Sequence, residues 1–161
     1  MRIGVLNVGI IVWTNNMKGY FGIGTYRGKT TDNLGTLWRS AYNFNANYIF
    51  TVEERYKHQR SDTCNTPKQI PLFQYKTWQD FIKSLPENAE IICVEQCKGS
   101  RNLKDFVHPK HAIYLLGAED QGIPEELMKG HQKVHIDTPH SLNVAVAGSI
   151  IMYDRSIKLK Q

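Results

Sequence analysis

The sequence predicts a single α/β domain built on a mainly parallel sheet with helices on both faces. Short β-rich runs alternate with helical patterns along the chain, and this alternation is typical of strand–helix–strand units. The length of 161 residues suits one domain, and no internal repeat, linker or low-complexity tract divides residues 1–161. Hydrophobic residues make up 41% and charged residues 22% of the chain, which are ordinary values for a globular protein.

The predicted strands are short and rich in β-branched and aromatic residues. The first, Tyr20–Tyr26, contains two glycines, and glycine inside a strand often marks the close approach of another backbone. Residues 1–16 read as an added strand or a leader that ends at Asn15-Asn16. The remaining strands are expected over 47–52, 69–75, 89–95, 112–116 and 133–136, with a polar, basic loop over 53–68.

The helices are placed by apolar spacing and by capping residues. The first follows apolar positions from Leu34 to Tyr42, with Asp32 or Asn33 as its N-cap. A proline favours a first helical position, so another helix is expected from Pro124. The others are expected over 77–85, capped by Thr77, over 141–157, capped by Ser141, and as a short helix or turn over 101–107.

Charge and cysteine content restrict the class of protein. A net charge of +5 favours polyanionic partners without proving one. The three cysteines are too few and too oddly spaced for a disulfide framework or a zinc site, and we expect Cys93 to be a buried strand residue and no metal to be bound. No apolar run is long enough to span a membrane, and residues 3–13 lack the features of a signal peptide. We therefore expect a cytoplasmic protein.

One apparent nucleotide-binding motif fails on its spacing. The run Gly24–Thr30 resembles a P-loop, whose backbone amides wrap a phosphate and which needs four residues between its two glycines. Counting back from Gly28, Gly24 leaves three residues and Gly22 leaves five. This spacing disfavours a P-loop nucleotide enzyme.

Three other segments combine glycine with polar residues at the start of a helix or the end of a strand. In Asn33-x-Gly35-x-x-x-Arg39, the glycine leaves a helical turn open to a neighbour, and arginine suits phosphate recognition. The run 115–124 is an apolar strand end followed by glycine and acidic residues, where open α/β sheets bind ligands. The run 136–148 leads into a helix of small residues that permits close packing. Each segment alone also fits an ordinary capped helix or loop.

Together the three segments resemble the signature motifs of the SPOUT methyltransferases, in the same order and at similar spacing. They are similar to the TrmH branch, also called SpoU, which methylates the ribose 2′-hydroxyl of tRNA or rRNA. The resemblance covers about residues 20–155. The motif N-x-G-x-x-x-R is met by Asn33, Gly35 and Arg39, G-x-E-x-x-G by Gly117, Glu119 and Gly122, and S-L-N-V-x-V-A by residues 141–147.

The resemblance implies a deep C-terminal trefoil knot, a homodimer and S-adenosyl-L-methionine as cofactor. The sequence departs from the family pattern after Ile136, where Asp137 and Thr138 open a shorter loop. By the same resemblance, the cofactor is expected to bind at three strand ends and at the start of the last helix. The residues expected to hold it are Val94, Glu95, Leu116, Gly117, Ile136, Ser141, Leu142 and Ala145.

The resemblance also implies catalytic residues. Arg39 would assist removal of the hydroxyl proton; since an arginine has a pKa above about 12, we favour a grip on an RNA phosphate over direct base action. Asn33, Glu119, Ser141 and Asn143 would shape the site and hold the target nucleotide. The presence of this whole set disfavours the alternative of a catalytically idle RNA-binding dimer. Base methylation remains an alternative reaction.

The RNA partner is suggested by charge and size. We find no added RNA-binding domain in the chain, so a compact tRNA is favoured over an rRNA site, which stays the alternative. Basic residues near the predicted site are candidates for contacts to RNA phosphates; the alternative is a solvated loop. These residues are Arg27, Lys29, Arg55, Lys57 and Arg60.

Overall fold

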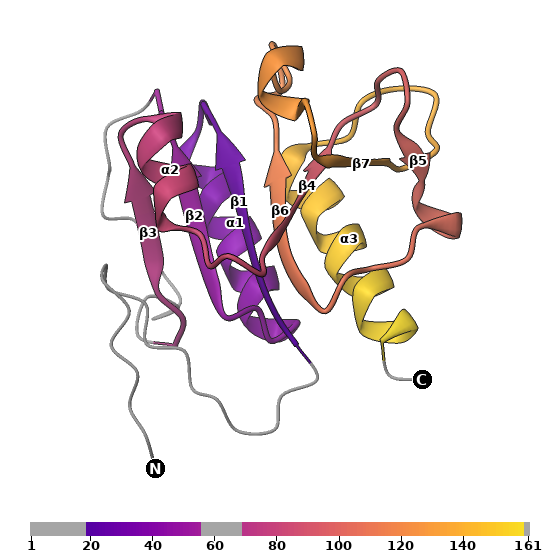
Figure 1. The fold of residues 1–161 in the computed structure, drawn as a ribbon, viewed down its shortest axis with the longest axis horizontal. Coiled ribbons are helices and arrows are strands. Elements are labelled where there is room, and N and C mark those ends of the chain that lie inside the picture. Colours follow the sequence, from indigo (N-terminus) through magenta and orange to yellow (C-terminus); the bar gives the residue numbers. More distant parts are fainter. Residues whose placement is uncertain (1–18, 56–68, 160–161) are drawn as a thin grey trace.

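The computed structural model describes residues 19–55 and 69–159. Within these residues, seven strands form one sheet in the order β3-β2-β1-β6-β4-β7-β5, and all neighbouring strands run parallel (Figure 1). The strands are β1 Tyr20–Tyr26, β2 Tyr48–Val52, β3 Leu72–Tyr75, β4 Glu90–Val94, β5 Arg101–Asn102, β6 His111–Leu116 and β7 Gln132–His135. The helices are α1 Thr31–Asn43, α2 Trp78–Ser84 and α3 Val144–Lys158, with 3₁₀ turns η2 Leu103–Asp105 and η3 Glu125–Met128.

The strand predictions agree with the structure except at one sheet edge. All six expected strands are present, and Cys93 is buried in β4, as predicted. The expected helix or turn over 101–107 instead begins with β5, which pairs with β7 through Arg101 and Asn102 before η2 starts. Two residues carry too little pattern to reveal a strand. The predicted extra strand or leader over 1–16 lies outside the described residues.

Two of the predicted helix caps are wrong, because tertiary contacts use the side chains differently. Helix α1 begins at Thr31 with no side-chain cap, and Asn33 in its first turn bonds to Glu119 instead. Helix α3 is capped by Asn143, whose Oδ1 accepts hydrogen bonds from the amides of Ala145 and Val146, and not by Ser141. The helix expected from Pro124 is the 3₁₀ turn η3. The Thr77 cap of α2 is confirmed.

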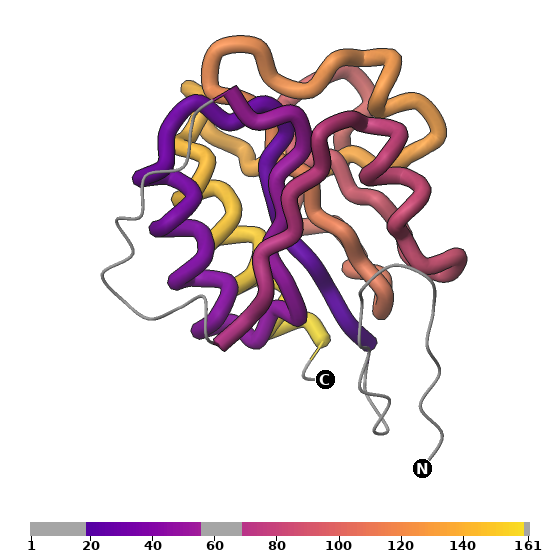
Figure 2. Tube along the Cα trace, turned by 90° about the vertical axis from the view of Figure 1, so that its left-hand side faces the viewer, coloured from indigo at the N-terminus to yellow at the C-terminus, as the bar shows by residue number. Residues whose placement is uncertain are grey.

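Residues of the central strand β6 point alternately to the two faces of the sheet. Tyr114 packs in a core with Leu37 of α1 and Ile151 of α3. Leu115 packs in a second core with Phe81 of α2. Helices α1 and α3 lie side by side on one face and α2 covers the other (Figure 2). The prediction of helices on both faces is therefore confirmed.

A buried polar network fixes the C-terminal half of α3. The Arg155 guanidinium donates to the carbonyl of Lys110 over 2.9 Å and lies 4.9 Å from the centre of the Phe21 ring. His108 is buried beside Asp154, with 2.8 Å between Nε2 and Oδ2. Burial lowers the pKa of His108, and the nearby Asp154 carboxylate partly offsets this. Because Arg155 and His108 have hydrogen-bond partners despite their burial, the network holds α3 against the start of β6.

The glycines of β1 allow β1 and β2 to lie close together. Gly24 pairs with Phe50, and a Cβ built on Gly24 would collide with the Phe50 carbonyl oxygen and come within 2.6 Å of its ring. Gly35 on α1 is the contrasting case, because a Cβ there meets nothing within 4 Å.

We predict that Gly24→Ala lowers the free energy of unfolding by at least about 1–3 kcal/mol, because the added methyl group overpacks the space between β1 and β2. Gly35→Ala is the matched control and should raise stability by about 0.5–1 kcal/mol, since alanine favours a helix. Urea unfolding followed by circular dichroism measures both. A Gly24→Ala protein as stable as the wild type would contradict the packing described.

Candidate active site

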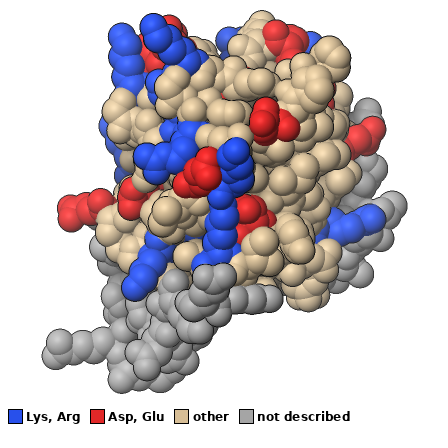
Figure 3. All heavy atoms as spheres, turned by 90° about the vertical axis from the view of Figure 1, so that its right-hand side faces the viewer, with Lys and Arg blue, Asp and Glu red and all other residues tan. Residues whose placement is uncertain are grey.

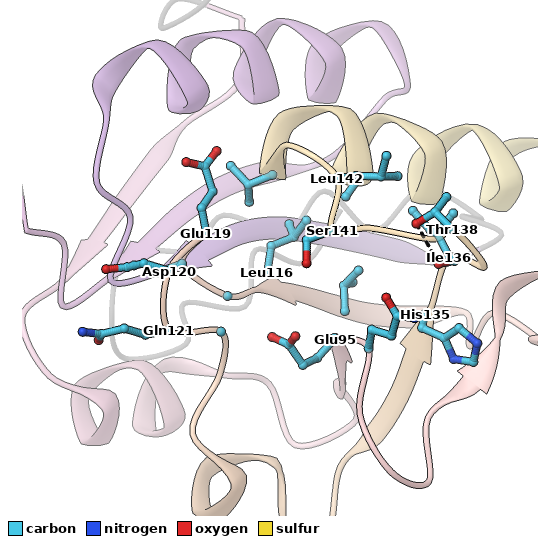
Figure 4. Close-up of a pocket in the computed structure, with 17 residues that line it drawn as sticks. Glu95, Leu116, Glu119, Asp120, Gln121, His135, Ile136, Thr138, Ser141 and Leu142 are labelled. Atoms are coloured by element: carbon cyan, nitrogen blue, oxygen red, sulfur yellow. Dashed lines mark hydrogen bonds between the residues drawn. The ribbon is translucent and has the colours of Figure 1, made fainter.

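A cavity of about 310 Å³ opens where the carboxyl ends of β4, β6 and β7 meet (Figure 4). This is the edge at which open α/β sheets bind ligands. Seven of the eight residues expected to bind a cofactor line it, whereas Ala145 is buried in α3 and does not. The seven are Val94, Glu95, Leu116, Gly117, Ile136, Ser141 and Leu142.

The sequence analysis missed other residues of the cavity wall. His135 lines the cavity from the end of β7, although no sequence motif marked it. Asp120 and Gln121 also line it, and both lie within the 115–124 segment that was singled out for its glycines and acids. Their position in the chain could have revealed them, because each ends a parallel strand or belongs to the loop after one.

The loop after β6 folds back tightly on itself. A Cβ on Gly117 would lie 2.7 Å from the Cα of Gly122, and Gly122 itself has a φ of +63°. The Glu95 carboxylate, at the end of β4, accepts a hydrogen bond from the Ile123 amide over 3.0 Å. Gly117 is thus required by the loop itself, and not only by a ligand at the backbone.

Three expected catalytic side chains form one hydrogen-bonded group, which we call the Asn–Glu–Asn cluster (Asn33, Glu119 and Asn143). Asn33 Nδ2 donates to Glu119 Oε1 over 2.7 Å. Asn143 Nδ2 lies 2.9 Å from Asn33 Oδ1 and 3.1 Å from Glu119 Oε1, and donates to both. The cluster joins α1, the loop after β6 and the start of α3, at the rim of the cavity.

The other two expected catalytic residues lie outside this cluster. Ser141 lines the cavity from the loop before α3. Arg39 is exposed on α1, six residues beyond Asn33, which corresponds to about 9 Å along the helix and about a third of a turn around it. Arg39 is not among the residues that line the cavity. The site therefore has two parts, a cavity with its polar rim and an arginine further along α1.

The expected RNA-binding cations are only partly brought together. Lys29 Nζ lies 2.7 Å from Asp120, and Arg55 makes a two-pronged contact of 2.7 and 3.2 Å with the same carboxylate. Arg55 and Lys29 hold the pKa of Asp120 well below its usual range. Arg27 adjoins them through its carbonyl, which accepts from Arg55 Nε over 2.9 Å. Lys29 and Arg55 therefore share one internal anion, which offsets one of their two positive charges.

The rest of the predicted basic surface cannot be assembled from the described residues. Lys57 and Arg60 lie outside them. On the face that carries β5, cationic and anionic side chains are interspersed and no patch of one sign dominates (Figure 3).

The described residues also bear on metals, thiols and membranes. Among them, no group of three histidine, cysteine or acidic side chains is placed to hold a metal. Cys93 and Cys97 are free, and burial raises the pKa of Cys93 to about 12, so it is not a thiolate nucleophile. No helix in the described ranges combines the length and apolar character needed to cross a bilayer.

Comparison with known proteins settles the family. The model of the SpoU rRNA Methylase family matches residues 23–153. The chain belongs to this family. It is 26% identical over 140 residues, 78% of this chain and 82% of the relative, to a Mycoplasma genitalium protein provisionally assigned as a tRNA (cytidine(34)-2'-O)-methyltransferase.

Solved structures confirm the fold class. One, described as giving insight into the 2-OH methylation of C/U34 on tRNA, superposes with a TM-score of 0.78 at 18% identity, covering 89% of this chain and 92% of the other. The A. aeolicus TrmH/SpoU tRNA modifying enzyme superposes with a TM-score of 0.75 at 20% identity, covering 87% and 75%. The trefoil knot implied by the resemblance stays a prediction.

Asn143 both caps α3 and donates to the cluster, and two substitutions separate these roles. We predict that Asn143→Ser keeps unfolding free energy within about 0.5 kcal/mol of wild type, because serine is a good N-cap, while methyl transfer to RNA falls about 10- to 100-fold. Asn143→Ala should lose the same activity and about 1 kcal/mol of stability. Thermal unfolding and a methyl-transfer assay measure the two effects. Full activity in Asn143→Ser would show that the cluster does not position the reactants.

Proposed function

We propose that this protein transfers a methyl group from S-adenosyl-L-methionine to the 2′-hydroxyl of a ribose in tRNA. The observation that carries the proposal is the Asn–Glu–Asn cluster at the rim of a cavity formed by three parallel strand ends. Membership of the SpoU rRNA Methylase family supports the same reaction class.

The cavity suits the cofactor in size and lining. Its volume of about 310 Å³ lies at the lower end of the range typical of small-molecule sites, roughly 300–1,000 Å³. Leu116, Ile136 and Leu142 give it apolar walls for an adenine ring, and the strand ends supply backbone polar groups beside them. When bound, the cofactor supplies an activated methyl group on a sulfonium; the protein supplies position and charge.

The polar residues have separate tasks in this proposal. Asn33 and Asn143 fix the Glu119 carboxylate, so the rim presents hydrogen-bonding groups in a set geometry to the incoming nucleotide. Arg39 grips a backbone phosphate, and arginine and phosphate together orient the hydroxyl and help to remove its proton. An arginine that stays protonated is better suited to this role than to that of a general base.

The choice of tRNA rests on the relatives. Two Mycoplasma relatives, one 26% and one 22% identical to this chain, carry provisional assignments as tRNA (cytidine(34)-2'-O)-methyltransferases. The net charge of +5 suits a polyanionic substrate. An rRNA site is the alternative, and the family name supports testing it. We include a cytoplasmic location in the proposal, in keeping with the free thiols of Cys93 and Cys97.

We propose further that the protein works as a homodimer, held by an apolar stripe on α3. Val146, Tyr153 and Ile157 are 48%, 57% and 46% exposed and recur at helical spacing on one side of the helix. Tyr42 at the end of α1 is 44% exposed, so apolar surface is present on both helices of this layer. A second copy of the chain would cover these side chains.

Tyr153→Glu should convert the dimer to a monomer, because a carboxylate in the apolar stripe would be buried without a partner. Light scattering coupled to size exclusion should give twice 18.5 kDa for the wild type and 18.5 kDa for the variant. Val107→Glu is the matched control, since Val107 is 75% exposed but lies off the stripe, and it should remain dimeric. A monomeric wild type would refute the dimer.

The reaction is tested with tritiated S-adenosylmethionine and unmodified total tRNA or rRNA, followed by digestion to nucleosides. We expect label in a 2′-O-methylnucleoside from tRNA. Arg39→Ala should reduce incorporation at least about 100-fold. The control is Arg101→Ala, in the edge strand β5 and away from α1, and it should not reduce incorporation.

Each other outcome of this assay has a set meaning. Label only in rRNA would show that the substrate is rRNA and not tRNA. Label in a base would refute ribose methylation. No label in either RNA, despite tight binding of S-adenosylhomocysteine, would favour an idle RNA-binding protein.

A further inference from the structure

One anion and two cations connect the loops that follow three different strands. Asp120 lies after β6, Lys29 after β1 and Arg55 after β2, and all three strands end at the same edge of the sheet. Arg55 uses two guanidinium nitrogens on one carboxylate, at 2.7 and 3.2 Å, and Lys29 lies 2.7 Å from the same group. The arrangement is a pair of cations that shares one bound anion.

This trio is next to the proposed reaction site. Asp120 directly follows Glu119, whose side chain leaves the loop in a different direction to join the Asn–Glu–Asn cluster (Figure 4). Asp120 also lines the cavity. An anion bound by Lys29 and Arg55 would therefore lie beside the loop that carries Glu119 of the cluster.

The carboxylate of Asp120 can be replaced at low cost. All three side chains are partly exposed, with side-chain exposures of 43% for Lys29, 25% for Arg55 and 32% for Asp120. Exposed ion pairs contribute little to stability, since solvent and salt screen them. The planar fork of arginine that matches a carboxylate matches a phosphate equally well.

The turn that carries Lys29 has supports besides Asp120. The Arg55 amide donates to the Gly28 carbonyl over 3.2 Å, and Arg55 Nε donates to the Arg27 carbonyl over 2.9 Å. These bonds remain if the Asp120 carboxylate leaves. The cations would then stay in place and gain free donors.

We propose that Lys29 and Arg55 form a subsite for an RNA phosphate, and that Asp120 occupies it as an internal stand-in for that phosphate until RNA displaces it. This inference rests on the proposed function and deepens it. Asp120 lowers affinity for RNA in general, so that only RNA with further contacts at the site replaces the carboxylate.

The test measures binding of end-labelled total tRNA to Asp120→Asn at several salt concentrations, with S-adenosylhomocysteine present. We expect binding about 2- to 5-fold tighter than wild type, as loss of an exposed competing ion pair implies. The slope of log affinity against log salt should steepen, because the wild-type carboxylate that RNA displaces takes up salt cations and so offsets part of the cation release from the bound phosphate. Adding Lys29→Gln and Arg55→Gln to Asp120→Asn should abolish both effects.

The control is Glu87→Gln, which changes the net charge by the same amount. Glu87 precedes β4 and so lies where the parallel strands begin, whereas Asp120 lies where they end. It should change affinity and slope little. Asp120→Asn binding that is no tighter than Glu87→Gln binding would overturn the proposal. So would weaker binding with a lowered melting temperature, because Asp120 would then be a structural brace. If the wild type showed no methyl transfer but Asp120→Asn still changed the salt dependence of RNA binding as predicted, the proposed enzyme would be refuted and the phosphate subsite would not.

Discussion

The hydrogen bonds of the Glu119 carboxylate hold the proposed site together. Asn33 and Asn143 are 110 residues apart, and both donate to one oxygen of Glu119. Through these bonds the first turn of α1, the loop after β6 and the start of α3 take fixed positions relative to one another. Asn143 carries the constraint further, because its own oxygen starts α3. If the cluster shifted, the cavity wall and the helix beside it would shift together.

The parallel sheet explains why such distant residues can meet. Every strand in it ends at the same edge, so the loops after β1, β2, β4, β6 and β7 converge there. The cavity takes its walls from three of these loops, and the cation pair of Lys29 and Arg55 comes from the other two. Glu119 and Asp120 are neighbours in one loop, and they connect the Asn–Glu–Asn cluster to the proposed phosphate subsite. In the proposed mechanism, cofactor, ribose and phosphate therefore take adjacent places on one edge of the sheet.

Much of this could be predicted from the sequence, and the failures share a cause. Strand and helix patterns depend on local spacing, so six strands and the main helices were placed correctly. The cap of α1 was wrong because Asn33 finds its partner 86 residues away. The pairing of Arg55 with Asp120 joins residues 65 apart, and no local pattern signals it. Position after a parallel strand indicates which loops meet, but not which side chains bond within them.

The central claim is that the cavity at the ends of β4, β6 and β7 holds the cofactor. Hydrogen–deuterium exchange with and without S-adenosylhomocysteine tests it directly, because bound ligand slows the opening of the amides around it. The account predicts slower exchange over residues 94–96, 116–122 and 135–142, with little change in β3 and α2. Protection confined to β3 and α2, with none in the three loops, would contradict it.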